Sequence, residues 1–195
     1  MKRYYDRRAP EYDTWYLGTG SYAHLDRPRW LEEMEALEGV IAGLPPARTL
    51  DVACGTGFLT RWLPGNIVGV DQSEAMIAIA RSQAPRTRFV RGDALALPFP
   101  GGSFARAFTG HFYGHLEEPE RARFLAEARR VAAELVVVDS ALGDDVEPEE
   151  WQERVVSDGS RYLVFKRYFT GAQLAEELSG GEVLLEGRWF VVVRA

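Results

Sequence analysis

One stretch of the chain, residues 48–61, constrains the fold more than any other. It reads R-T-L-D-V-A-C-G-T-G-F-L-T-R, so a short apolar run ends in a glycine pair and an amphipathic segment follows. This order is typical of a buried parallel strand, a tight turn and a helix, expected here over 57–63. Gly55 and Gly57 would let the backbone approach a ligand, and the helix would offer free N–H groups beside it. We therefore expect a nucleotide-like cofactor at this turn.

The rest of the chain after residue 47 alternates between strand and helix patterns. Such alternation predicts an α/β fold, a doubly wound and mostly parallel sheet with helices on both faces. In the tail, 161–169 is expected as a strand and 170–178 as a helix, and the runs 182–186 and 188–194 form an antiparallel hairpin. The remaining expected strands are 48–53, 66–71, 87–91, 103–109 and 134–140, and the remaining helices are 57–63, 73–83 and 117–132.

The first 45 residues differ from the rest, because they are rich in aromatic side chains and contain no strand-like run. Helical spacing of the apolar residues predicts two helices broken around residues 18–20, the second beginning at Pro28 and ending before Pro45. The aromatic side chains either pack against the domain body or form a lid over the cofactor. We interpret residues 1–45 as a helical lid and 46–195 as the core of a single domain, 1–195.

Composition excludes several functional classes. The formal net charge of −6 argues against a dedicated nucleic-acid-binding protein, which usually carries a basic surface. Cys54 is the only cysteine, so no internal disulfide can form, which suits a reducing cytoplasm. No apolar run resembles a signal peptide or is long enough to span a bilayer. We expect a soluble, cytoplasmic protein with no membrane or nucleic-acid partner.

Three acidic residues follow or end the first three strands: Asp51, Asp71 and Asp93. Asp71 lies 20 residues after Asp51, where an acid can accept both hydroxyls of an adenosine ribose. The glycine pattern differs from the NAD-binding form, because Thr60 stands where the third glycine of G-x-G-x-x-G is required. There is also no second half-domain for a nicotinamide. The pattern therefore supports the binding of an adenosine ribose but does not match the NAD form of the fingerprint.

Residues 47–140 resemble the class I S-adenosylmethionine-dependent methyltransferases. The matching stretches are L-D-V-A-C-G-T-G-F-L-T, V-G-V-D-Q-S-E-A-M-I-A-I-A-R, F-V-R-G-D-A-L-A-L-P-F-P-G-G-S-F and G-H-L-E-E-P followed by A-R-R-V. The chain looks most like the small-molecule branch that includes the ubiquinone- and menaquinone-pathway enzymes. The resemblance implies a seven-stranded sheet of order 3-2-1-4-5-7-6 with the last strand antiparallel. It also implies S-adenosylmethionine as cofactor and S-adenosylhomocysteine as product.

The resemblance assigns the cofactor-binding residues. Glycines would pass under the methionine moiety, one acid would lie near its ammonium, and another would hold the ribose hydroxyls. The tyrosines of the amino-terminal segment would lie nearest the cofactor and the acceptor. The implied cofactor residues are Asp51, Ala53, Gly55, Gly57, Asp71, Gln72, Met76, Asp93, Ala94 and Tyr12, and the implied acceptor residues are Tyr5 and Tyr16. Two features depart from the family pattern: Ala53 replaces a usual glycine, and residues 131–134 lack the usual proline-glycine-glycine turn.

Methyl transfer from a sulfonium needs positioning of the acceptor, and needs a base only if the acceptor must lose a proton. His111 lies where an acceptor would approach and is a candidate general base or positioning group, although a structural imidazole remains the alternative. His115 fits a structural role, while Tyr113 and Phe112 are candidates for the acceptor pocket. The spacing of the two histidines could suit a metal, but no third ligand is evident, so we expect none. Cys54 suits a small buried residue better than a nucleophile.

The sequence predicts a small-molecule methyltransferase, and three alternatives stay open. An RNA or protein methyltransferase is disfavoured by the acidic charge and by the lack of a target-binding appendage. A cofactor-binding regulatory protein would bind S-adenosylmethionine without turnover. A NAD(P) oxidoreductase would bind NAD instead.

Overall fold

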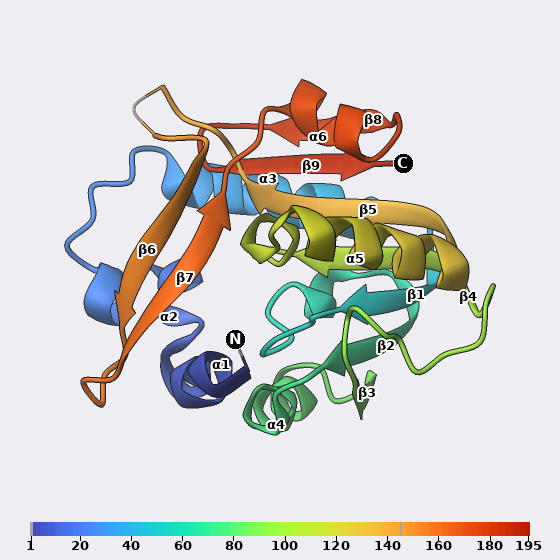
Figure 1. Cartoon of the computed structure of the whole chain (residues 1–195), viewed down its shortest axis with the longest axis horizontal. Coiled ribbons are helices and arrows are strands. Elements are labelled where there is room, and N and C mark those ends of the chain that lie inside the picture. The colour runs from blue at the N-terminus through green and yellow to red at the C-terminus, as the bar shows by residue number, and fades with distance from the viewer. Residues whose placement is uncertain (1, 145) are drawn as a thin grey trace.

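The computed structural model describes residues 2–144 and 146–195 and places a seven-stranded sheet at the centre of the molecule (Figure 1). The strands are ordered β3-β2-β1-β4-β5-β9-β8. The first five run parallel, and β9 runs antiparallel to both β5 and β8. This confirms the expected order and the reversed last strand. The strands are β1 (Ala47–Val52), β2 (Gly65–Asp71), β3 (Arg88–Arg91), β4 (Phe104–Gly110), β5 (Ala132–Ser140), β8 (Glu182–Glu186) and β9 (Phe190–Arg194).

Helices cover both faces of the sheet, because successive side chains of a buried strand point to opposite faces. Val137 of β5 packs with α5 (Glu118–Val131) and α6 (Gly171–Glu177) in one core. Its neighbour Val136 packs with α3 (Trp30–Ala42) in a second core. In Figure 1, α5 lies in front of the sheet and α3 behind it. The chain thus has the three-layered α/β architecture that its alternating pattern predicts.

Capping residues fix where the confirmed helices begin. Ser73 accepts a hydrogen bond from the backbone N–H of Met76 at the start of α4 (Glu74–Gln83). The helices α5 and α6 each begin with a reciprocal capping box, which in α6 pairs Thr170 with Gln173. These caps satisfy N–H groups that have no partner within the helix. They bear out the helices expected over 73–83, 117–132 and 170–178.

The helix expected over 57–63 is wrong. Only a single 3-10 turn, η3 (Thr60–Trp62), follows the glycine turn. Gly57 is in the left-handed region with φ +78°, and Pro64 ends the segment, so the six residues between them could form at most about 1.7 helical turns. The free helical N–H groups that the sequence suggested beside the ligand are therefore not provided by this segment.

A second, two-stranded sheet stands apart from the main one. It consists of β6 (Glu149–Val155) and β7 (Arg161–Arg167), paired antiparallel across the Asp158–Gly159 turn. The strand β7 falls within the expected 161–169, whereas β6 was not predicted. In Figure 1 this hairpin projects from the carboxyl end of the sheet beside the amino-terminal helices. Tyr4, Val156 and Val164 form one buried cluster that joins the hairpin to those helices.

The amino-terminal segment is more broken than two helices. It comprises α1 (Lys2–Arg8), η1 (Ala9–Glu11), α2 (Thr14–Leu17) and η2 (Gly20–Tyr22), and α3 begins at Trp30 instead of Pro28. The expected break is present, since Gly18 ends α2 in the left-handed conformation with φ +63°. The Ser73 hydroxyl donates to Asp6 Oδ1 at 2.6 Å, which ties α1 to α4. The segment therefore bridges α4 and the hairpin.

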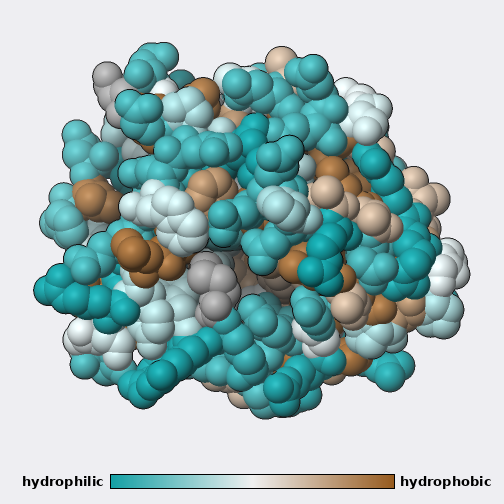
Figure 2. Space-filling model, viewed as in Figure 1, coloured by the Kyte–Doolittle hydropathy of each residue, from teal (hydrophilic) through white to brown (hydrophobic). Residues whose placement is uncertain are grey.

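The face drawn in Figure 2 is mostly hydrophilic, with hydrophobic side chains recessed near its centre. Over the part of the chain that the structure describes, no helix is both long and apolar enough to cross a membrane.

Candidate functional site

The carboxyl ends of the parallel strands surround a cavity of about 280 Å³. Asp71 is the last residue of β2, Asp93 follows β3, and His111 follows β4. Because parallel strands end at the same edge of a sheet, these residues meet although they are far apart in sequence. From the predicted site, the cavity is lined by Tyr5, Tyr12, Ala53, Gly55, Asp71, Gln72, Met76, Asp93, Ala94 and His111.

The Asp71 carboxylate is almost fully buried yet faces this cavity. It accepts hydrogen bonds from the backbone N–H groups of Gly55, at 2.9 Å, and Ser73, at 2.8 Å. Burial raises the pKa of Asp71 above its usual value, and the backbone donors oppose that shift. A carboxylate has about four lone-pair positions, so this group can accept further hydrogen bonds from the cavity side.

The turn after β1 brings backbone to the cavity wall. Ala53 and Gly55 are both in the left-handed region, with φ +56° and φ +55°. A Cβ atom added to Gly55 would lie 3.7 Å from Tyr12 Cε1, and both residues line the cavity. Glycine at position 55 therefore keeps this space open. Ala53 is a non-glycine residue in a conformation that costs about 1–2 kcal/mol, at the position where the family pattern has glycine.

A second cavity, of about 690 Å³, adjoins the first. It lies between the amino-terminal segment, the hairpin and the end of β5. Tyr16 lines only this larger cavity. Four residues border both cavities: Tyr5, Tyr12, His111 and His115. The small cavity could hold one molecule and the large cavity another, with these four side chains where the two would meet.

His111 is buried among aromatic rings at that junction. Its ring centroid lies 4.9 Å from that of Trp15 and 5.7 Å from that of Tyr16. Burial lowers its pKa to about 4, so the imidazole is neutral at pH 7. Its Nε2 atom has no hydrogen-bond partner among residues 2–144 and 146–195. The backbone of His111 has φ +51°, an uncommon conformation for a residue with a side chain, and such strain often occurs at functional sites.

His115 has a clear structural partner. Its Nδ1 atom lies 2.7 Å from the Phe165 carbonyl oxygen, which can only accept, so Nδ1 donates and Nε2 keeps a lone pair. Burial and nearby Lys166 lower the pKa of His115 to about 3. Lys166 pairs at 2.7 Å with Asp139, and both side chains are buried. Burial alone would raise the pKa of Asp139, but the contact with Lys166 holds it below its usual value.

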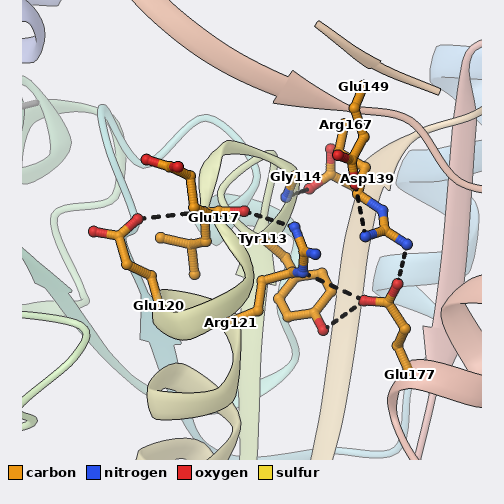
Figure 3. A network of polar contacts seen from close by, with 10 residues as sticks. Tyr113, Gly114, Glu117, Glu120, Arg121, Asp139, Glu149, Arg167 and Glu177 are labelled. Carbon is orange, nitrogen blue, oxygen red and sulfur yellow. Dashed lines mark hydrogen bonds and ion pairs between the residues drawn. The ribbon is translucent and has the colours of Figure 1, made fainter. Parts of the chain in front are cut away.

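Three predicted site residues line neither cavity. Asp51 is buried and accepts a hydrogen bond from the Thr60 hydroxyl at 2.5 Å, and burial raises its pKa to about 7. The space beside Gly57 is filled by Ala80 of α4, whose Cβ would lie 3.2 Å from an added methyl group. Tyr113 points away from the junction, and its hydroxyl donates to Glu177 at 2.9 Å (Figure 3).

Sequence reasoning missed the residues that build the large cavity. Trp15, Arg8 and Arg27 come from the amino-terminal segment, and Arg154 and Lys166 come from the hairpin. A usable signal was present for the hairpin, since Asp158-Gly159 is a preferred hairpin turn between two strand-length runs. Cys54, expected to be buried, is only half-buried, although desolvation still raises the pKa of its thiol well above the usual value. Within residues 2–144 and 146–195, no group of three or more His, Cys, Asp or Glu side chains is arranged to hold a metal.

Comparison with known proteins finds relatives over part of the chain. Residues 49–134 match the model of a methyltransferase domain. The chain is 41% identical over 97 residues to demethylmenaquinone methyltransferase of Thermus thermophilus, covering 45% of this chain and 43% of that protein. It is 34% identical over 118 residues to 2-phytyl-1,4-naphtoquinone methyltransferase of Thermosynechococcus vestitus, covering 55% and 49%. The matches thus span less than half the length of these two relatives.

Solved structures extend the similarity to nearly the whole fold. A complex named DhpI-SAM-HEP superposes with a TM-score of 0.77 at 25% identity, covering 98% of this chain and 94% of that one. An S-adenosylmethionine-dependent methyltransferase from Thermotoga maritima shares the fold with a TM-score of 0.68 at 22% identity, covering 100% and 98%. Residues 49–134 are thus similar to a methyltransferase domain, and nearly the whole chain shares the fold of solved S-adenosylmethionine-dependent methyltransferases.

Proposed function

We propose that this protein transfers a methyl group from S-adenosylmethionine to a small-molecule acceptor. The observation that carries the proposal is the pair of adjoining cavities, of about 280 and 690 Å³, which share Tyr5, Tyr12, His111 and His115. Two substrates that exchange a group must bind side by side, with their reacting atoms at the boundary. The small cavity is the proposed cofactor site, and the large cavity is the proposed acceptor site.

Features of the small cavity support an adenosyl cofactor. Asp71 has lone pairs free to accept two ribose hydroxyls while its backbone contacts stay intact. The Asp93 Oδ1 atom accepts from the Leu95 N–H at 2.9 Å, which leaves Oδ2 for an exocyclic amine. Gln72, Met76 and Ala94 line the same end, where an adenine ring would lie. The open space at Gly55 suits the methionine moiety.

The junction residues suit the reaction. When bound, S-adenosylmethionine would supply an electrophilic methyl group on its sulfonium. The acceptor atom would attack the methyl carbon in line with the carbon–sulfur bond, which breaks as the new bond forms. Tyr5 and Tyr12 offer aromatic rings whose faces attract cationic groups. The neutral His111 can accept a hydrogen bond from the acceptor and position its nucleophilic atom. A pKa of about 4 makes His111 a weak base, so positioning is its proposed main role.

Location, partners and the amino-terminal segment complete the proposal. We place the protein in the cytoplasm, supported by its single cysteine, and propose no nucleic-acid or membrane partner, supported by its net charge of −6. Residues 1–45 act as a lid in the proposed single domain.

Ligand titration and a transfer assay test the proposed function. Calorimetry should give a dissociation constant for S-adenosylhomocysteine in the micromolar range, on the order of −8 kcal/mol, and no heat for NAD. Incubation with methyl-labelled S-adenosylmethionine and a panel of small hydroxy and amino compounds should give labelled products. Binding of NAD in place of S-adenosylhomocysteine would sink the proposal. Label found only in RNA or protein would mean that the acceptor is a macromolecule and not a small molecule. Binding of S-adenosylmethionine without turnover on any acceptor would indicate a regulatory protein.

A further inference from the structure

The large cavity is positively charged in a chain whose net charge is negative. Its lining includes five cationic side chains against two carboxylates, Asp26 and Asp144, both on exposed residues. The cations come from three separate parts of the chain, the amino-terminal segment, the hairpin and the turn before β9. They are Arg8, Arg27, Arg154, Lys166 and Arg188. Because the whole chain carries −6, this concentration of cations is local to the cavity.

Only one of these cations is neutralised within the described chain. Lys166 pairs with Asp139 at 2.7 Å, and both groups are buried. In residues 2–144 and 146–195, no carboxylate lies within 4.0 Å of a charged nitrogen of Arg8, Arg27 or Arg154. A guanidinium that is partly withdrawn from water without an anion is unfavourable unless something else compensates it.

Arg8 and Arg27 show this lack of compensation most clearly. Arg8 donates to the hydroxyls of Tyr4 and Tyr22, and its Nε atom is buried without a partner among the described residues. Arg27 donates from Nη1 to the Trp15 carbonyl at 2.8 Å, and its Nη2 atom is likewise buried and unpaired in the described chain. Each guanidinium therefore keeps one donor that no described residue satisfies, and each arginine lines the large cavity.

The two arginines also share a neighbour. The guanidinium carbon of Arg8 lies 5.5 Å from the centroid of the Tyr22 ring, and that of Arg27 lies 6.0 Å from it. Two like charges held against one ring repel each other, and the repulsion is stronger where water is partly excluded. An anion that bridges the two guanidinium groups would offset this repulsion through charge-assisted hydrogen bonds.

We propose that the methyl acceptor carries an oxyanion, a carboxylate or a phosphonate or phosphate, which Arg8 and Arg27 bind in the large cavity. This inference rests on the proposed methyl transfer and names its substrate class. The guanidinium carbon of Arg8 lies 5.6 Å from the centroid of the Tyr12 ring, and Tyr12 borders both cavities. The oxyanion is therefore held near Tyr12 at the edge of the junction, so the acceptor is a compact molecule whose reacting atom faces His111.

The test compares matched ligands on the unmodified protein saturated with S-adenosylhomocysteine. The probes are 4-hydroxybenzoate, 4-hydroxyphenylphosphonate and the neutral 4-hydroxybenzamide, titrated by calorimetry. At least one anion should bind ten-fold or more tightly than the amide, since charge-assisted hydrogen bonds to arginine are strong. The carboxylate and phosphonate arms show which oxyanion the site prefers. Equal or tighter binding of the amide, or no binding of either anion up to about 10 mM, would overturn the proposal.

Variants locate the anion site. Arg27→Gln and Arg8→Gln should each weaken the preferred anion about ten-fold or more and leave the amide nearly unchanged. Arg161→Gln is the matched control, because Arg161 lies on the exposed edge of the hairpin, paired with Glu153. If both cavity variants retain the full preference for the anion, the assignment to these arginines is wrong. Because Arg8 also contacts two tyrosines, Arg27→Gln keeps the test valid should Arg8→Gln fail to fold.

The same titrations separate two kinds of failure. S-adenosylhomocysteine should bind Arg27→Gln as it binds the parent, because Arg27 lines only the large cavity. Loss of S-adenosylhomocysteine binding in the parent would defeat the proposed methyl transfer itself. Retained binding with no preference for an anion would defeat only the assignment of the acceptor class.

Discussion

At the scale of single residues, Asp71 couples the end of β2 to the turn after β1 through its hydrogen bond to Gly55. Its proposed contacts to ribose hydroxyls are charge-assisted, each worth about 1.5–3 kcal/mol. Asp71→Asn keeps an acceptor for one backbone N–H but loses the charge. It should weaken S-adenosylhomocysteine about ten- to a hundredfold, as measured by calorimetry. Asp93→Asn should weaken the binding of S-adenosylhomocysteine less, because the proposed partner of Asp93 is a neutral amine. Parent-like binding by both variants would refute the placement of the adenosine.

Asp51 makes the stability of the protein depend on pH. Burial raises its pKa to about 7 in the folded state, whereas an unfolded aspartate has a pKa of about 3.9. The folded state therefore keeps a proton that the unfolded chain releases between about pH 4 and 7, so this group's contribution to stability falls as pH rises through that window. Asp51→Asn removes that dependence, and its penalty for a buried amide is independent of pH.

Urea unfolding of the parent and Asp51→Asn at pH 5 and pH 8 measures this effect. The free energy of unfolding of the variant relative to the parent should rise between these pH values by on the order of 2–4 kcal/mol. The histidines contribute equally to both proteins and cancel in the difference. A difference that stays constant with pH would show that Asp51 ionises as it does in the unfolded chain.

Ala53 and Gly57 provide a matched pair of substitutions in one loop, since both have positive φ. Ala53→Gly relieves a strain of about 1–2 kcal/mol and loses about 0.4–1 kcal/mol through the greater freedom of the unfolded chain. It should stabilise the protein by about 0.5–1 kcal/mol. Gly57→Ala should destabilise by about 1–3 kcal/mol, because it adds strain and a close contact with Ala80. Thermal unfolding checks the signs, and opposite signs would contradict the backbone geometry of this turn.

At the scale of elements, the amino-terminal segment connects α4 to the hairpin. Asp6 contacts Ser73, and Tyr4 packs with Val156 and Val164 of the hairpin region. Tyr5 and Tyr12 border both cavities, so movement of this segment would change the access of ligands to both. The proposed lid should therefore be less protected from hydrogen exchange than the sheet when no ligand is bound.

Hydrogen exchange with and without S-adenosylhomocysteine tests the lid. Protection should increase across residues 2–24 on binding, while β5, buried at the centre of the sheet, should be protected in both states. High and equal protection of residues 2–24 in both states would mean that this segment is ordinary core.

The sheet could be predicted from sequence because each of its strands has its own pattern. Apolar runs bounded by glycine and charged residues located β1 to β5, and the resemblance supplied their order. The amphipathic pattern of residues 57–63 predicted a helix that does not form. The pattern takes no account of the left-handed conformation of Gly57 or of Pro64, which follows the segment. The strand β6 was missed because charged residues hide its alternation, E-E-W-Q-E-R-V, although Asp158-Gly159 marked the turn.

The site was predictable only where it follows strand ends. Position along the chain located Asp71, Asp93 and His111 at one edge of the sheet, since the topology brings those ends together. The sequence could not show that the Asp51 side chain bonds to Thr60, or that Tyr113 turns toward Glu177. Nor could it bring Arg8 and Arg27 to one ring, because these contacts depend on how irregular segments fold back over the sheet.

At the scale of the whole molecule, the proposed function depends on the two cavities and on the side chains that they share. The sheet forms the floor of the small cavity, and the amino-terminal segment and the hairpin enclose the large one. The cofactor is proposed to lie in the first and an anionic acceptor in the second. Methyl transfer between them requires that both ligands reach the four shared side chains.

A crystal structure with S-adenosylhomocysteine tests this arrangement most directly. The account predicts density for adenosine in the small cavity, with both ribose hydroxyls within hydrogen-bond distance of the Asp71 carboxylate. The sulfur should face Tyr5, Tyr12 and His111 at the opening to the large cavity. Density for the adenosine in the large cavity, or away from Asp71, would contradict the account.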